Sequence, residues 1–135
     1  MPSIALIVDD DKTSRDVMCR LLSHAGAMVI PVTNGHDALL VLEGSPVHAI
    51  ITDLEMSHLD GRELCAAIRR HPSLRATPIL LVSASPRIAA ECEAIDADAY
   101  LQKPFDAREF VETFRALVAS KRSRRRRSRK PPFVH

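Results

Sequence analysis

Hydrophobic residues along the chain follow two patterns that alternate. Five short apolar runs, rich in β-branched residues, are each followed by a stretch in which apolar residues recur every three or four positions. The first pattern is typical of strands that are buried on both faces, and the second is typical of amphipathic helices. The predicted strands are residues 4–8, 28–32, 49–52, 78–82 and 99–102.

The predicted helices follow the strands one by one. Gly26 ends the first helix, Gly61 begins the third, and Asp106 caps the last. Strands and helices that alternate over short connections form right-handed crossovers and one parallel sheet with helices on both faces. The sequence therefore predicts a doubly wound α/β domain of five strands and five helices. The helices are expected at residues 13–25, around Ala38, Leu39 and Leu42, at 61–71, at 86–94 and after Asp106.

Four of the five strands end in residues with chemically active side chains. Asp9 and Asp10 follow the first strand and Asp53 follows the third. Ser83 follows the fourth strand and Lys103 follows the fifth. The ligand site of a doubly wound sheet lies beyond the carboxyl ends of its strands, at the switch in strand order. We therefore expect these five side chains to converge on one edge of the sheet.

Carboxylates that converge in this way repel each other unless a cation lies between them. Mg²⁺ suits the site because it binds one or two carboxylates, a main-chain carbonyl and waters, and leaves room for a phosphoryl oxygen. An aspartate beside this ion can attack a phosphoryl donor and form an acyl phosphate. Lys103 supplies a positive charge and Ser83 a hydroxyl donor for the transferring group. The pattern indicates phosphoryl transfer to an aspartate.

Motifs between residue 4 and about residue 119 resemble the receiver domain of bacterial two-component response regulators in both order and spacing. The resemblance implies a flavodoxin-like sheet with strand order 2-1-3-4-5, as in a chemotaxis member of the family. It also implies a signalling phosphoacceptor rather than an enzyme, phosphorylated by a sensor histidine kinase or a histidine phosphotransfer protein. The motifs are Asp9-Asp10, Ile50-Ile51-Thr52-Asp53-Leu54-Glu55-Met56, Asp60-Gly61, Ser83-Ala84 and Tyr100-Leu101-Gln102-Lys103-Pro104-Phe105.

The resemblance assigns Asp53 as the phosphoacceptor and assigns a set of ligands for Mg²⁺ or Mn²⁺. Asp10 and Asp53 are implied as direct ligands, and Asp9 supports the metal directly or through water. The main-chain carbonyl of Glu55 is implied as the remaining protein ligand. Asp11, next in the sequence, is interpreted instead as a residue of the helix N-terminus.

Three further residues receive roles from the same resemblance. Lys103 pairs with the phosphoryl oxygens and is joined to Pro104 by a cis peptide bond. Ser83 is implied to swing toward the phosphoryl group, and Tyr100 to change rotamer into the space that Ser83 leaves. These two switch residues couple one added charge to the surface around the fourth helix and fifth strand.

A few positions depart from the usual pattern of the family without removing a catalytic group. Ser57 stands where proline is usual, so the loop after Asp53 loses a fixed φ and is expected to be more mobile. Asp96 stands where glycine is usual, and Ala99 stands where a second acid is common. Because Asp tolerates a left-handed conformation less well than Gly, the end of the fourth helix is expected to be altered.

The formal net charge of +2 hides two oppositely charged parts. Residues 1–120 carry a net charge of −6, from 11 Lys and Arg against 17 Asp and Glu, whereas residues 121–130 carry +8. A block of like charges this dense repels itself and rarely folds alone. The sequence predicts a receiver domain over residues 1–120 and a basic, disordered tail over residues 121–135.

The tail leaves three interpretations open. It is a solvated extension, or it binds nucleic acid or an anionic membrane surface through counterion release, or it docks on an acidic protein such as the body of this chain. Aromatic residues are not interleaved with its arginines, and no helix-turn-helix pattern is present, so sequence-specific recognition of nucleic acid is not expected.

Other features of the sequence indicate a cytoplasmic protein without a transmembrane segment. No apolar run reaches the roughly 18 residues that a membrane span needs, and the N-terminus lacks a signal-peptide pattern. Cys19, Cys65 and Cys92 are widely spaced in helical, apolar contexts and are interpreted as reduced packing residues.

Two other functions compete with a phosphorylated, stand-alone receiver that signals to an unknown downstream protein. The stretch Asp9-Asp10-Asp11-Lys12-Thr13 fits the nucleophile motif of haloacid-dehalogenase-type phosphatases, but that family usually needs a longer chain with a cap region and a further acidic motif. A pseudo-receiver would keep the fold as a binding module without phosphorylation. The complete set of Asp9, Asp10, Asp53, Ser83 and Lys103 argues against it.

Overall fold

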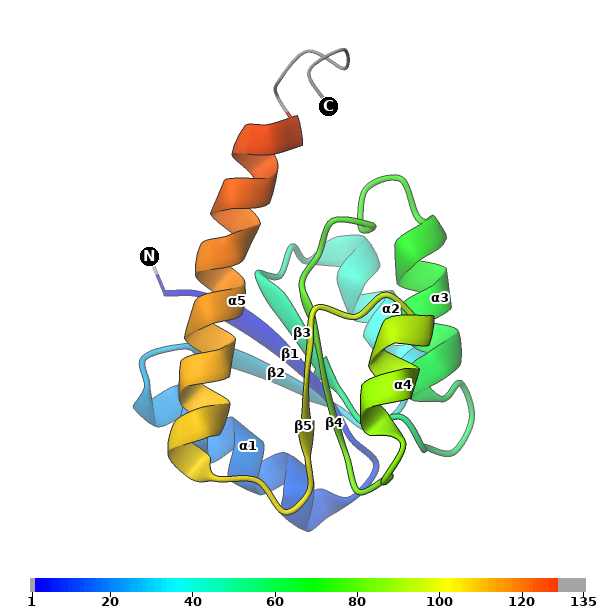
Figure 1. Cartoon of the computed structure of the whole chain (residues 1–135), viewed down its shortest axis with the longest axis vertical. Helices are drawn as coiled ribbons and strands as arrows, with labels where there is room; N and C mark the ends of the chain where they lie inside the picture. The colour runs from blue at the N-terminus through cyan, green and yellow to red at the C-terminus, as the bar shows by residue number, and fades with distance from the viewer. Residues whose placement is uncertain (1, 129–135) are drawn as a thin grey trace.

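The computed structural model describes the backbone of residues 2–128 and the side chains of residues 2–120. Its five strands form one parallel sheet in the order β2-β1-β3-β4-β5 (Figure 1). This order confirms the predicted doubly wound α/β fold. The elements are β1 (Ile4–Val8), α1 (Lys12–His24), β2 (Met28–Val32), α2 (Gly35–Gly44), β3 (Ala49–Thr52), α3 (Gly61–Arg70), β4 (Ile79–Ser83), α4 (Ile88–Ala94), β5 (Ala99–Gln102) and α5 (Ala107–Ser128).

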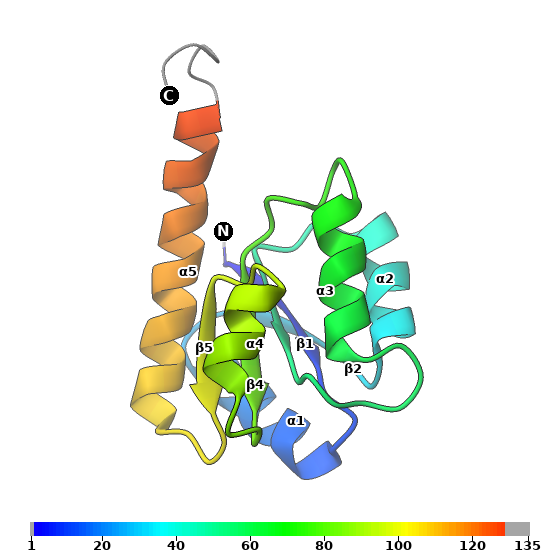
Figure 2. The same cartoon turned by 45° about the vertical axis from the view of Figure 1, so that its right-hand side comes forward.

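The helices cover both faces of the sheet, with α1 and α5 on one face and α2, α3 and α4 on the other (Figures 1 and 2). Side chains of each central strand alternate between two hydrophobic cores. In β1, Ala5 and Ile7 pack in the core under α1 and α5, whereas Leu6 and Val8 pack in the core under α2, α3 and α4. Burial on both faces explains why this strand is apolar at every position.

The element boundaries follow local capping chemistry. Asp11 caps α1, because its side chain accepts a hydrogen bond from the Ser14 main-chain N–H, so the predicted place of Asp11 at the helix N-terminus is confirmed. Asp60 and Glu63 form a reciprocal capping box at the start of α3. α4 begins at Ile88 rather than residue 86, after Arg87, which makes no side-chain capping bond.

α5 reaches beyond the predicted domain boundary at Ser120. Its buried residues Phe110, Phe114 and Leu117 hold the first turns of the helix against the sheet. The helical backbone then continues to Ser128 (Figure 1). The rest of the predicted tail, residues 129–135, lies outside the described residues, and the division of the chain at Ser120 stays a prediction. No helix in the described part of the chain combines the length and the apolar character that crossing a membrane requires.

The three cysteines are free thiols, and two of them, Cys65 and Cys92, are buried. Burial raises the pKa of the Cys65 thiol to about 12 and raises the pKa of the Cys19 and Cys92 thiols above their usual value. Thiols held in the protonated form are weak nucleophiles, which agrees with the packing role expected from the sequence.

Arg69 organises the end of the sheet that lies away from the carboxyl ends of the strands. Its guanidinium donates hydrogen bonds to the carbonyls of Arg75, Thr77 and Asp96, at 2.7–2.9 Å, and to the Asp98 carboxylate at 2.9 Å. Asp96 has φ 56°, so it takes up the left-handed conformation that ends α4. The Arg69 contacts hold this turn in place, a role that the sequence pattern did not indicate.

Candidate functional site

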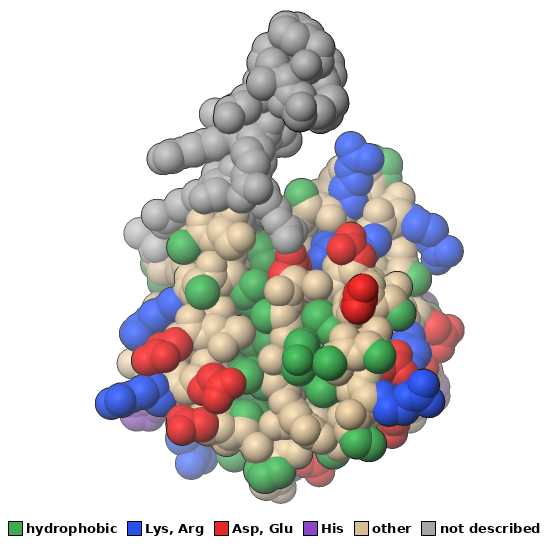
Figure 3. Space-filling view, viewed as in Figure 1, with side chains coloured by type: hydrophobic (Ala, Val, Ile, Leu, Met, Phe, Trp, Pro, Cys, Tyr) green, Lys and Arg blue, Asp and Glu red, His purple; other side chains and the backbone are tan. Residues whose placement is uncertain are grey.

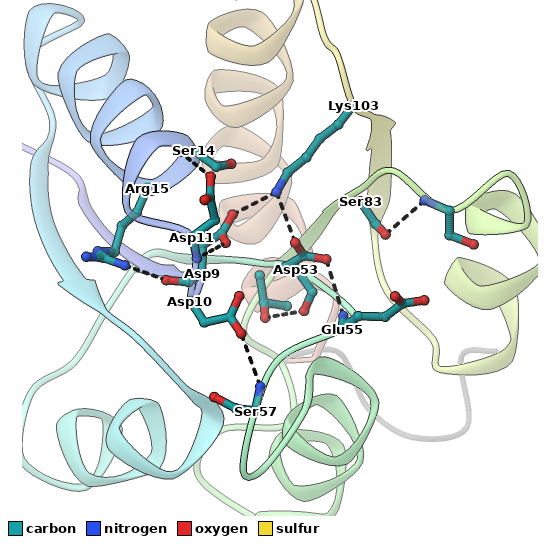
Figure 4. Close-up of polar contacts among 12 residues, drawn as sticks. Asp9, Asp10, Asp11, Ser14, Arg15, Asp53, Glu55, Ser57, Ser83 and Lys103 are labelled. Atoms are coloured by element: carbon teal, nitrogen blue, oxygen red, sulfur yellow. Dashed lines mark hydrogen bonds and ion pairs between the residues drawn. The ribbon is translucent and has the colours of Figure 1, made fainter.

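The predicted side chains converge at the carboxyl ends of the strands (Figure 4). Strands β1 and β3 are paired so that Val8 lies beside Thr52, which places the next residues, Asp9 and Asp53, next to each other. The Asp53 main-chain N–H donates to the Val8 carbonyl at 3.1 Å and extends this pairing by one residue. The parallel register therefore brings together two acids that are far apart in the sequence.

Lys103 joins these two acids. Its Nζ lies 2.8 Å from Asp9 Oδ2 and 2.9 Å from Asp53 Oδ2. The Asp9 side chain is fully buried, and the side chains of Asp53 and Lys103 are 14% and 20% exposed. Burial alone would lower the pKa of the Lys103 ammonium, but the hydrogen bonds and negative charges of Asp9 and Asp53 outweigh it and raise that pKa above its usual value. Lys103 is therefore a fixed positive charge at the site.

The two neighbouring acids Asp9 and Asp10 have different surroundings. Both carboxylate oxygens of Asp9 are bound, Oδ2 to Lys103 and Oδ1 to the Asp11 main-chain N–H at 2.9 Å. Arg15 also donates to the Asp9 carbonyl, at 2.8 Å. Asp10 is exposed, and its Oδ2 accepts a hydrogen bond from the Ser57 main-chain N–H at 3.2 Å. Asp9 is thus a buried structural partner, whereas Asp10 faces the solvent side of the site.

Asp53 borders a pocket of about 390 Å³ on its other side. Asp53 Oδ1 accepts a hydrogen bond from the Glu55 main-chain N–H at 3.3 Å, so the β3–α3 loop begins by turning back toward this carboxylate. Charged and hydroxyl side chains form most of the pocket wall. The lining residues are Asp53, Glu55, Ser83, Ala84, Ser85, Pro86 and Lys103.

The two switch candidates occupy different surroundings in this structure. Ser83 is buried, and its Oγ accepts a hydrogen bond from the Ser85 main-chain N–H at 3.2 Å (Figure 4). Tyr100 lies in β5 with 45% of its surface exposed. The Lys103 main-chain N–H donates to the Ser83 carbonyl at 2.8 Å, and the peptide bond between Lys103 and Pro104 is cis. β5 thereby presents Lys103 beside the end of β4.

Comparison with known proteins identifies the family. Residues 5–115 match the family model of the response regulator receiver domain. The chain belongs to this family. It is 32% identical over 117 residues to protein PilG of Pseudomonas aeruginosa, a match that covers 85% of this chain and 87% of PilG. It is 34% identical over 120 residues to response regulator MprA of Mycolicibacterium vanbaalenii, and there it spans about half, 51%, of the relative's length.

Solved structures of response regulators share the fold of this receiver domain. A response regulator from Chloroflexus aurantiacus superposes with a TM-score of 0.84 at 33% sequence identity, covering 88% of this chain and 99% of the other. The chemotaxis response regulator CheY4 of Vibrio cholerae superposes with a TM-score of 0.80 at 28% identity, covering 87% of this chain and 99% of CheY4. Receiver domains act in general as signalling phosphoacceptors and use Mg²⁺ for phosphorylation.

The oxygen atoms available at this site suit Mg²⁺ better than an ion whose ligands must all come from protein side chains. Within residues 2–120, no group of three or more His, Cys, Asp or Glu side chains is placed to hold a metal together. Mg²⁺ needs only one or two carboxylates and keeps several waters. Asp10 and Asp53 face the same edge, and Glu55 lies beside Asp53 in the loop that follows β3 (Figure 4). Asp9, whose two oxygens are already bound, fits a supporting role better than direct ligation.

Two glycines shape the receiver site through close backbone contacts. A Cβ on Gly61 would overlap the carbonyl oxygen of Asp53 and lie 2.7 Å from Leu54 Cα. A Cβ on Gly35 would lie 2.5 Å from the carbonyl oxygen of Leu59, which accepts a hydrogen bond from the Gly35 N–H at 3.0 Å. Gly61 is part of the Asp60-Gly61 motif, but the need for a glycine there comes from the close approach of the β3–α3 loop backbone.

Proposed function

We propose that this receiver domain is a phosphorylation-controlled switch in which Asp53 accepts a phosphoryl group from a sensor histidine kinase or a histidine phosphotransfer protein. The observation that carries the proposal is the position of Lys103 Nζ, within 2.9 Å of both Asp9 and Asp53. A partly buried cation beside a strand-terminal carboxylate can stabilise the negative charge of the oxygens during in-line phosphoryl transfer. The family's general function supports the same assignment.

In the proposed reaction, a carboxylate oxygen of Asp53 attacks the phosphorus of a phosphohistidine. An O–P bond forms, the P–N bond breaks, and the electron pair returns to the imidazole of the donor. Lys103 stays protonated and pairs with the oxygens of the transferring group, which carry the negative charge. Mg²⁺, when bound, supplies further positive charge to those oxygens. Asp10, Asp53 and the Glu55 carbonyl are the proposed protein ligands, with Asp9 in support.

The proposed switch involves Ser83 and Tyr100. In this structure the Ser83 hydroxyl oxygen accepts a bond from the Ser85 N–H, and its own proton is available to a new acceptor. A phosphoryl group on Asp53 introduces such an acceptor in the pocket that Asp53 and Ser83 line. Movement of Ser83 would free space for the exposed ring of Tyr100. The affected surface lies over β5, where hydrophobic side chains gather between α4 and α5 (Figure 3), and it is the proposed contact for a downstream protein.

Chemical phosphorylation tests the proposal directly. The protein is incubated with acetyl phosphate and Mg²⁺, and the intact mass of wild type and of Asp53→Asn is measured. We expect wild type to gain the mass of one phosphoryl group and Asp53→Asn to gain none, because the amide is not a nucleophile toward phosphorus. The gain should disappear when Mg²⁺ is removed by chelation. No gain in either protein would favour a pseudo-receiver that binds partners without phosphorylation.

We further propose that the basic segment of residues 121–130 contacts polyanions without sequence specificity. Its charge of +8 over ten positions supports binding driven by counterion release. Replacing Arg124, Arg125, Arg126 and Arg127 by Gln is expected to weaken binding to a DNA duplex and to make binding less sensitive to salt. Fluorescence anisotropy at several salt concentrations measures both effects, with anionic vesicles as a parallel probe. Equal binding and equal salt dependence in the variant would refute a contact driven by this segment.

A further inference from the structure

The main-chain amide of Ser57 makes a long-range contact that links two parts of the site. Its N–H donates to Asp10 Oδ2 at 3.2 Å, across 47 positions in the sequence. Figure 4 shows the bond running from the β3–α3 loop to Asp10, two residues after the end of β1. A proline, which the family usually has at this position, has no N–H and cannot make this bond. The contact is therefore available to this chain because position 57 is not proline.

The bond lies in the middle of the β3–α3 loop, and other main-chain hydrogen bonds hold residues on either side of it. The Gly35 N–H binds the Leu59 carbonyl at 3.0 Å, and the Gly61 N–H binds the Leu54 carbonyl at 2.9 Å. Between Ser57 and Leu59, His58 has φ 62°, so the chain makes a sharp left-handed turn directly after the Ser57 amide. The loop without proline is joined to Asp10 by this hydrogen bond, and its expected greater mobility stays a prediction.

The hydrogen bond also orients the Asp10 carboxylate. Asp10 is exposed, so without a partner its side chain would sample several rotamers. Binding of Oδ2 to the amide favours rotamers that keep this contact, and it leaves the other oxygen and the remaining lone pair of Oδ2 for a cation. The Glu55 carbonyl is a proposed ligand beside Asp10 and Asp53. Glu55 lies in the same loop, two residues before Ser57. The bond thereby joins Asp10 to the loop that carries the other proposed ligand, the Glu55 carbonyl.

We propose that the Ser57 main-chain N–H is a positioning donor that pre-organises the cation site of this receiver. The proposal rests on the proposed function, because it takes Asp10 and the Glu55 carbonyl as ligands of Mg²⁺. Hydrogen bonds to metal ligands orient them, and loss of such a partner typically lowers metal affinity by about 10- to 100-fold. Ser57 is not itself a ligand, and its side-chain hydroxyl has no part in the proposal.

Two substitutions at the same position separate the amide from the side chain. Ser57→Ala removes the hydroxyl and keeps the N–H, whereas Ser57→Pro removes the N–H. Mg²⁺ affinity of the full chain is measured by isothermal titration calorimetry for wild type and both variants. We expect Ser57→Ala to match wild type and Ser57→Pro to bind Mg²⁺ about tenfold more weakly. Equal affinity in all three proteins, or an equal loss in both variants, would overturn the proposal.

Hydrogen exchange in the metal-free protein provides a second test that does not depend on the backbone restriction of proline. The Ser57 amide should exchange slowly in wild type, nearly as slowly in Asp10→Asn, which keeps an acceptor oxygen, and much faster in Asp10→Ala. Exchange that is equally fast in all three would overturn the proposal. Mass gain with acetyl phosphate is recorded for each Ser57 variant. If no protein gains a phosphoryl group, the proposed function fails, while the exchange rates still decide whether the amide positions Asp10.

Discussion

Gly61→Ala is expected to lower the free energy of unfolding by roughly 3 kcal/mol, as overpacking against rigid atoms does. The new Cβ would overlap the carbonyl oxygen of Asp53 and lie 2.7 Å from Leu54 Cα, and neither backbone atom can rotate away. Moving α3 outward would relieve the overlap only by breaking the 2.9 Å hydrogen bond from the Gly61 N–H to the Leu54 carbonyl. Because Asp53 itself is displaced, the yield of phosphorylation by acetyl phosphate should fall as well.

Gly44→Ala is the matched control for this substitution. Gly44 is the last residue of α2, and a Cβ there would have no other atom within 4 Å. Alanine is the better helix former, so this variant should be more stable than wild type by up to about 0.5–1 kcal/mol. Urea denaturation followed by circular dichroism measures both variants. A Gly61→Ala protein as stable as Gly44→Ala would show that the start of α3 adapts to a side chain.

Lys103→Met is expected to destabilise the metal-free protein by about 2–4 kcal/mol. Lys103 is the shared partner of the fully buried Asp9 and of Asp53, which is 14% exposed. Methionine keeps much of the length of the side chain but removes the charge, so two carboxylates at neighbouring strand ends lose their cation. The carboxylates then repel each other, and Asp9 keeps the Asp11 N–H as a partner. Urea denaturation at neutral pH, with Mg²⁺ chelated, measures the loss.

A double-mutant cycle isolates the electrostatic part of that loss. In an Asp53→Asn background the site holds one negative charge fewer, so Lys103→Met should cost less there than in wild type. The same Lys103→Met protein should also gain little or no mass from acetyl phosphate, because the transferring oxygens lose their cationic partner. If the two substitutions were additive, the contact between Lys103 and Asp53 would not contribute to stability. Full phosphorylation of Lys103→Met would remove Lys103 from the proposed mechanism.

Local sequence patterns predicted the fold closely where an element carries its own signal. The buried runs at Ile4–Val8 and Ala49–Thr52 coincide with strands, and the cap at Asp11 starts α1 where Asp11 was expected to lie. The pattern was weaker for α4, an Ala-rich helix that starts two residues later than predicted and lacks a side-chain cap at Arg87. Periodicity specifies which face of an element is buried, but a short helix with a weak cap leaves its first turn undefined.

The candidate site was predicted only as a set of residue types at strand ends. The division of roles between Asp9 and Asp10, one buried and one exposed, does not follow from two identical residues in sequence. Likewise, the absence of proline at position 57 predicted a loop without a fixed φ, but it did not predict the hydrogen bond between the Ser57 amide and Asp10. A main-chain N–H is present at almost every position, so sequence offers no signal for the one that meets a carboxylate.

Local patterns in the sequence specify the alternation of strands and helices and place Asp, Ser and Lys side chains where strands end. They do so because strand and helix periodicity and capping are local properties of a few neighbouring residues. Which of those side chains meet depends on how the strands are ordered and aligned in the folded sheet. The contacts of Lys103 with Asp9 and Asp53 span 94 and 50 positions, and they depend on the register of β1 with β3 and on the place of β5 beside β4. Register and neighbour order come from packing of the whole sheet against its helices, which no local pattern encodes.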